Sequence, residues 1–128
     1  MVHKNNKWNI TKDKGEELAH RYIIEILKDS KNLTISLSEL IILLNQRTKH
    51  IKIINHSKPK PLSVYMRNVY GNIINFFDLF NIYCIIYKDN DIFIKLMDEY
   101  IDYDDKLKEI SKGYSEWIFI DNEEFVIV

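Results

Sequence analysis

The spacing at which apolar residues recur changes near residue 80, and this change constrains the fold more than any other feature of the chain. Up to that point the apolar residues recur at intervals of three and four, the period of an amphipathic helix. Beyond it, the run IYCIIYKDNDIFIKL is typical of β-strands. Helices followed by strands predict an α+β protein. With 128 residues, 46% of them hydrophobic, the chain is expected to form one domain with its own core.

Two helices are predicted in the first third of the chain. Residues 15–28 repeat apolar side chains at helical spacing, with acidic residues in the first turn and Lys28 in the last, as the helix dipole favours. Ser36 and Glu39 form a capping box, in which the hydroxyl and the carboxylate satisfy the free amides at a helix start. This second helix is predicted to end near Gln46.

A third helix is predicted over residues 61–80. Pro59 and Pro61 keep the residues before them extended, so the basic loop of residues 47–60 ends where this helix begins. Residues 51–54 in the loop are predicted to form a short strand. The apolar side of the helix is expected to be buried and contains Leu62, Tyr65, Val69, Ile73, Phe76 and Phe80. Its polar sides contain Ser63, Arg67, Asn68, Asn72 and Asn75.

The last part of the chain is predicted to contain two hairpins and a helix. A β-hairpin is predicted at residues 82–96, because two β-rich runs flank the polar turn of residues 88–91. A helix is predicted to open at Asp102 and to have Gly113 as its C-cap. Residues 117–128 predict a short second hairpin, apolar on both faces, that is buried against the domain or against a second copy.

Three helices followed by a hairpin is the winged-helix order, in which the third helix is the recognition element and the hairpin is the wing. We therefore expect a single winged-helix-like α+β domain over residues 1–128. Its parts are an N-terminal arm at residues 1–14, a body at residues 15–96, and an extension at residues 97–128 that holds the last helix and the terminal hairpin.

Part of the chain resembles the LOTUS (OST-HTH) winged-helix domain. The resemblance covers about residues 18–96 and rests on the stretches ISLSEL and VYGNIINFFDLF, followed by the hairpin. The similar positions are Ile35, Leu37, Ser38, Leu40, Tyr70, Gly71, Phe76 and Phe77. The family usually starts a helix near that glycine, whereas the third helix predicted here begins at residue 61. The resemblance implies binding of RNA, including folded G-rich RNA, or docking of partner proteins such as helicases, and in some members an extra C-terminal helix.

Charge is unevenly distributed along the chain, although the net charge is only -1. Residues 40–77 contain six lysine or arginine residues and no acid, whereas residues 78–128 contain five basic and thirteen acidic residues. A basic block of this kind suits a polyanion. The alternative is that lysines simply solvate a long loop.

The sequence lacks the patterns of catalysis and metal binding, so we expect no enzymatic activity, no metal and no cofactor. Cys84 lies in an apolar run and is expected to be a small core residue rather than a reactive thiolate. His50 and His56 have no cysteine or carboxylate nearby to complete a zinc site. The run DYDDKLKEISKG begins like a calcium loop, but Lys106 and Leu107 stand where an oxygen ligand and a glycine are required.

The expected location is intracellular, either cytoplasmic or nuclear. The N-terminus lacks the apolar stretch of a signal peptide, and no apolar run reaches the roughly 18 residues of a membrane span. A single cysteine cannot form an internal disulfide. The abundance of Ile, Asn and Lys beside a single alanine is typical of a low-GC genome, such as that of a large DNA virus.

Two functions fit the sequence. In the first, the third helix and the basic loop bind DNA or RNA: lysines hold phosphates, and arginine and asparagine contact base edges. The residues expected to bind are Arg47, Lys49, Lys52, Lys58, Lys60, Arg67, Asn68 and Asn72. Tyr65 and Tyr70 either stack on bases or belong to the core. In the second function, the chain is a protein-interaction module that binds a second copy or a cellular or host factor through its acidic last third.

Overall fold

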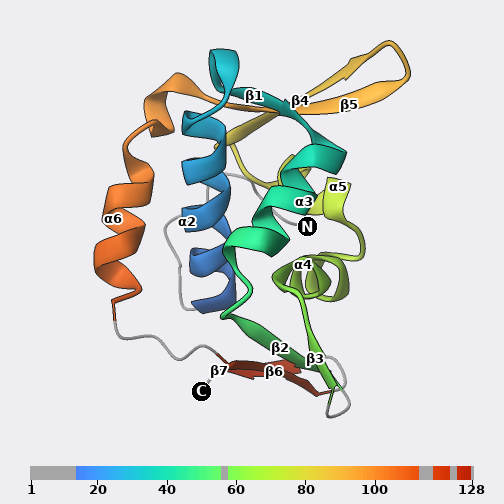
Figure 1. The fold of residues 1–128 in the computed structure, drawn as a ribbon, viewed down its shortest axis with the longest axis vertical. Helices are drawn as coiled ribbons and strands as arrows, with labels where there is room; N and C mark the ends of the chain where they lie inside the picture. The colour runs from blue at the N-terminus through green and yellow to red at the C-terminus, as the bar shows by residue number, and fades with distance from the viewer. Residues whose placement is uncertain (1–13, 56–57, 113–116, 122–123, 128) are drawn as a thin grey trace.

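A computed structural model describes residues 14–55, 58–112, 117–121 and 124–127, which form an α+β fold (Figure 1). These residues contain five helices and two β-sheets, so the predicted α+β class is confirmed. Almost all of the predicted N-terminal arm lies outside the described residues, and so does Gly113, the predicted C-cap.

Helix α2, Lys14–Lys28, runs through the middle of the molecule, between α6 and α3 in Figure 1. It matches the first predicted helix closely. Leu18, Ile24 and Ile26 are all buried although helical spacing places them on different sides of the helix axis. A helix enclosed in this way supplies core side chains to several neighbours at once.

Helix α3, Leu37–Arg47, begins at the predicted cap. Ser36 is its N-cap residue, and the Ser36 hydroxyl accepts a hydrogen bond of 3.3 Å from the backbone N–H of Glu39. The residues just before the helix, Thr34–Ser36, form strand β1, which the sequence did not predict. Three residues are too few for a recognisable period, and this strand is defined by its pairing with a distant one.

The predicted single helix over residues 61–80 is wrong, because the chain forms two helices there. Helix α4, Leu62–Tyr70, ends at Gly71, whose φ of 90° is a conformation that L side chains rarely adopt. Helix α5, Ile73–Leu79, starts after Asn72, whose side-chain oxygen accepts a hydrogen bond of 2.7 Å from Asn75 N–H. The apolar spacing continues across this break, so periodicity alone could not reveal it.

The break also changes which side chains are buried. Leu62, Tyr65, Phe76 and Phe80 are buried as predicted, and Ile73 is half-buried against the core. Val69 was expected in the buried stripe but is 38% exposed, because the last turn of α4 extends past the core before the chain bends. Ser63 was placed on the polar side and is buried.

A three-stranded antiparallel sheet has the strand order β1-β5-β4. Strands β4, Tyr83–Lys88, and β5, Asp91–Leu96, form the predicted hairpin. The two turn residues, Asp89 and Asn90, have φ of 52° and 62°, the positive values that a tight two-residue hairpin turn requires. The prediction of this hairpin and of its turn chemistry is confirmed.

The expectation that Cys84 is a core residue is wrong. Side chains alternate between the two faces of a strand. On β4, Tyr83 is buried and Cys84 is therefore exposed.

A four-stranded sheet has the order β3-β2-β6-β7. Strand β2, Lys52–Asn55, contains most of the short strand predicted from the sequence and pairs antiparallel with β3, Lys58–Lys60. Strand β2 also pairs in parallel with β6, Trp117–Asp121, which forms a hairpin with β7, Glu124–Ile127. The predicted terminal hairpin is confirmed, and it pairs with the domain itself.

A short 3-10 helix, η2, Asp98–Tyr100, leads to α6, Tyr103–Ile110, which packs along α2 (Figure 1). Asp104 on α6 is 2% exposed and its carboxylate lies 2.9 Å from the Lys28 ammonium. This hydrogen bond raises the pKa of Lys28 above its ordinary value, against the opposite effect of burial.

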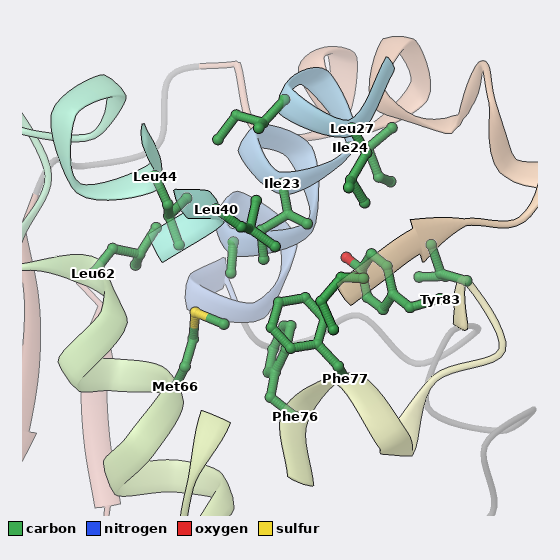
Figure 2. Packing of buried hydrophobic residues seen from close by; sticks show 14 of the residues in the cluster. Ile23, Ile24, Leu27, Leu40, Leu44, Leu62, Met66, Phe76, Phe77 and Tyr83 are labelled. Carbon is green, nitrogen blue, oxygen red and sulfur yellow. The ribbon is translucent and has the colours of Figure 1, made fainter. Parts of the chain in front are cut away.

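The core joins α2, α3, α4 and α5 to the three-stranded sheet (Figure 2). Its aromatic part contains Phe76, Phe77, Phe80 and Tyr83, whose rings meet mostly edge to face. His20 of α2 lies among them, fully buried, and its Nδ1 is 2.6 Å from the Tyr83 hydroxyl. Burial lowers the pKa of His20 to about 3.

Candidate nucleic-acid interface

The basic segment begins in a turn that buried residues hold in place. The backbone N–H and the hydroxyl of Thr48 both donate hydrogen bonds to the Leu44 carbonyl, at 3.0 Å and 2.6 Å, and Thr48 is buried. Ile51 is also buried, and its N–H donates to the Thr48 carbonyl at 2.9 Å. Lys49, between these two anchors, is exposed to solvent.

The chain continues into the β2–β3 hairpin, residues 52–60, which we call the basic hairpin. Lys52 belongs to β2, while Lys58 and Lys60 belong to β3, opposite Asn55 and Ile53 respectively. Strand β3 forms one edge of the four-stranded sheet, and β7, which begins with Glu124, forms the other. Strands β2 and β6 lie between the two edges, so Lys58 and Lys60 on β3 are separated from β7 by two strands, whereas Lys52 on β2 is separated from it by one.

Helix α4 packs against β2 (Figure 1). Its first half is buried. All residues from Leu62 to Met66 are buried, whereas Arg67, Asn68 and Val69 are exposed. The helix is thus not accessible along its length. The part of α4 open to a ligand is its last turn, at the α4–α5 corner of residues 67–72.

The other predicted binding residues have varied surroundings. Arg47 ends α3, and its guanidinium lies 3.4 Å from the Asp29 carboxylate, with both side chains exposed. Asn72 is exposed, but its side-chain oxygen caps α5. The fold groups Lys52, Lys58 and Lys60 in one hairpin, and Arg67, Asn68 and Asn72 at the α4–α5 corner.

Tyr65 and Tyr70 have structural surroundings rather than positions suited to base stacking. Tyr65 is fully buried, and α2 approaches it so closely that a Cβ on Gly15 would lie 2.7 Å from its Cε1. Tyr70 is half-buried and donates a short hydrogen bond to the Glu16 carboxylate. Of the two interpretations drawn from the sequence, the core role fits both residues.

The acidic residues of the last third are partly used within the fold. Asp104 pairs with Lys28 and also lies 3.7 Å from Lys108, which in turn lies 3.6 Å from Glu25 of α2. These pairs join α6 to α2. Lys28 and Lys108 therefore partly neutralise the acidic charge near α6 within the fold.

A second group of polar and aromatic residues was missed in the sequence. Asp78, Tyr87, Glu99 and Tyr100 line one groove although they come from α5, β4 and η2. No spacing relates residues that three different elements contribute, so no sequence signal points to this group.

Two features are absent from the part of the chain that the structure describes. It contains no group of three or more His, Cys, Asp or Glu side chains placed to hold a metal ion. None of the helices described is both long and apolar enough to cross a bilayer.

Comparisons of the chain with protein-family models, with curated proteins and with solved structures found no match.

Proposed function

We propose that this chain is a winged-helix-type protein that binds DNA or RNA, with phosphates held by the basic hairpin and by Lys49, and further contacts made at the α4–α5 corner. The observation that carries the proposal is the acid-free basic stretch, which folds into an edge hairpin and the helix that follows it. Lysines on an edge strand suit phosphate oxygens, which are held by charge rather than by shape.

The order of elements supports the winged-helix part of the proposal. Helix α2, strand β1, helix α3, helix α5 and the β4–β5 hairpin occur in this order along the chain, with β2, β3 and α4 between α3 and α5. Strand β1 pairs with β5 of the hairpin. The LOTUS-like domain that the sequence resembles usually starts a helix near its glycine, and α5 starts two residues after Gly71. The basic hairpin and α4 are then an insertion between the second helix and the helix before the wing.

Base contacts are restricted to the α4–α5 corner. Helix α4, which separates Lys60 from Gly71, is roughly 13 Å long, since a helix rises about 1.5 Å per residue. Arg67 and Asn68 are exposed there and are types able to contact base edges. Because the first half of α4 is buried, this helix does not lie lengthwise in a groove of the nucleic acid. Only its C-terminal end contacts the nucleic acid.

Lysine and proline on an edge strand also have a purely structural use. Both residue types discourage edge-to-edge pairing between sheets, and β3 reads Lys-Pro-Lys. A test of the proposal must therefore separate binding from protection of the edge.

The test is the affinity for labelled DNA and RNA oligonucleotides, measured by fluorescence anisotropy. The double change Lys58→Glu and Lys60→Glu is expected to weaken binding by about tenfold or more, because two phosphate contacts become repulsions. The matched control is Lys106→Glu with Lys112→Glu, which makes the same charge change at exposed positions near α6 and is expected to leave the affinity within about twofold. Unchanged affinity together with aggregation of the hairpin variant would assign the lysines to edge protection and reject the proposal.

The second function drawn from the sequence, a protein-interaction module, is favoured by a different observation. The groove between α5, β4 and η2 has no basic residue among the described residues that line it, and it carries exposed aromatic and acidic side chains.

A further inference from the structure

A groove of about 690 Å³ lies between α5, β4 and η2. It belongs to the side of the molecule built on the three-stranded sheet, whereas the basic hairpin belongs to the four-stranded sheet. The two surfaces are therefore made of different elements and can be altered separately. We call this surface the tyrosine groove.

Three tyrosines give the groove its aromatic character. All three line it: Tyr83 is buried, Tyr100 is half-buried, and Tyr87 is 70% exposed. Tyr83 is held in place, because its hydroxyl lies 2.6 Å from His20 Nδ1 and its ring centroid lies 5.0 Å from that of Phe77. Groups held in place before a ligand arrives lose little conformational freedom on binding.

The charge of the groove is negative. Asp78 and Glu99, both exposed, line it, and none of the lining residues that the structure describes is a lysine, an arginine or a histidine. A cation is attracted both by carboxylates and by the faces of tyrosine rings. A phosphate backbone would be repelled, so the tyrosine groove is unsuited to the ligand proposed for the basic hairpin.

The groove follows an edge of the three-stranded sheet. Strand β4 pairs with β5 on one side, and no described strand pairs with its other side. An extended segment of a partner can add to such an edge through backbone hydrogen bonds, while its side chains enter neighbouring pockets. Tyr83, Ile85 and Tyr87 of β4 all line the groove, as expected if the groove runs along this strand.

We propose that the tyrosine groove binds an extended segment of a partner protein that carries an arginine. The backbone of the segment adds to the outer edge of β4, and the guanidinium lies against Tyr87 or Tyr100 and pairs with Asp78 or Glu99. Arginine fits better than lysine, because the planar guanidinium stacks on an aromatic ring and donates two parallel hydrogen bonds to a carboxylate. This interaction is independent of nucleic-acid binding.

The test uses the full chain and a fluorescent peptide of about eight residues that alternates threonine and valine around one central arginine. Companion peptides carry lysine, glutamine or glutamate at the central position. We expect the arginine peptide to bind best and the glutamine peptide to bind about tenfold more weakly, since it lacks the charge. Amide signals of Tyr83–Lys88 are expected to shift in NMR spectra as the arginine peptide is added.

Two exposed positions allow matched variants. Glu99→Lys is expected to weaken binding of the arginine peptide by about tenfold, whereas Glu109→Lys, the same change on the exposed side of α6, is expected to leave it unchanged. Tyr87→Ala is expected to weaken binding, and Tyr87→Phe to retain it, because the ring face rather than the hydroxyl makes the contact.

Several results would overturn the proposal. These are equal binding of the arginine and glutamate peptides, an equal loss with Glu99→Lys and Glu109→Lys, and unshifted β4 amides at saturating peptide. A dimer that forms through β4 in sedimentation experiments and is broken by Tyr87→Ala would show that the occupant is a second copy of this chain.

Discussion

His20 is a titratable side chain that the fold encloses completely. Its ring stacks near those of Phe76 and Tyr83 and is nearly perpendicular to that of Phe80, with ring centroids 4.4–5.6 Å away. Because burial lowers its pKa to about 3, the folded state holds the imidazole neutral at pH values where the unfolded chain binds a proton.

The stability of the protein should therefore fall as the pH drops below the ordinary histidine value. The folded pKa lies below the unfolded one, so the contribution is complete above about pH 6.5 and is lost toward pH 3. Between about pH 7.5 and about pH 5 the free energy of unfolding is expected to fall by about 2 kcal/mol, a range that lies above the ordinary carboxylate pKa values. Urea denaturation at these pH values measures the change. It should be much smaller in His20→Leu and unaffected in His50→Ala, and an equal fall in His20→Leu would contradict this role of His20.

Gly71 is required by the conformation between α4 and α5. Its φ of 90° is strained for any L side chain, so Gly71→Ala is expected to cost about 1–3 kcal/mol. Asn68→Ala, an exposed change in the last turn of α4, is expected to be nearly neutral, because alanine favours a helix. Thermal unfolding compares the two variants. A neutral Gly71→Ala would mean that α4 and α5 can join into the single helix that the periodicity predicted.

At the scale of elements, α6 is joined to α2 by a buried carboxylate. The Asp104 side chain is 3% exposed, and its partner Lys28 is 28% exposed. Asp104→Ala should therefore destabilise the protein by about 1–3 kcal/mol, a loss limited by the access of the lysine to water. Asp105→Ala, at the exposed neighbouring position, should change stability by less than about 0.5 kcal/mol. Equal effects in chemical denaturation would show that the Lys28–Asp104 pair does not hold α6 in place.

Elements with a local cause were predictable, and elements that depend on distant partners were not. The Ser36 cap of α3 and the Asp89-Asn90 turn of the β4–β5 hairpin depend only on residues next to them in the chain, and both were predicted correctly. Strand β1 and the parallel pairing of β2 with β6 join segments about 60 residues apart, and no local pattern contains them.

At the scale of the whole molecule, the fold maintains the charge separation of the sequence. The basic residues of residues 40–77 fall at the end of α3 and in the turn after it, in the basic hairpin, and at the end of α4. Among the acids of residues 78–128, Asp104 joins α6 to α2, and Asp78 and Glu99 line the tyrosine groove. The sequence was sufficient to predict the basic block, because charge is a property of composition. It did not predict that all of Leu62–Met66 in α4 is buried, because that burial depends on packing against α2, α3 and β2 as well as on the apolar side of the helix.

The most direct test of the proposed function is how the affinity for nucleic acid depends on salt. If residues 47–67 neutralise about four to six phosphates, a plot of log affinity against log salt concentration should have a slope of about -4 to -5 for duplex DNA and about -3 to -4 for single strands. In the Lys58→Glu, Lys60→Glu variant the slope should be shallower by about 2 for duplex DNA. The absence of measurable affinity for any DNA or RNA at about 50 mM salt, or a slope that the hairpin variant leaves unchanged, would contradict the proposal.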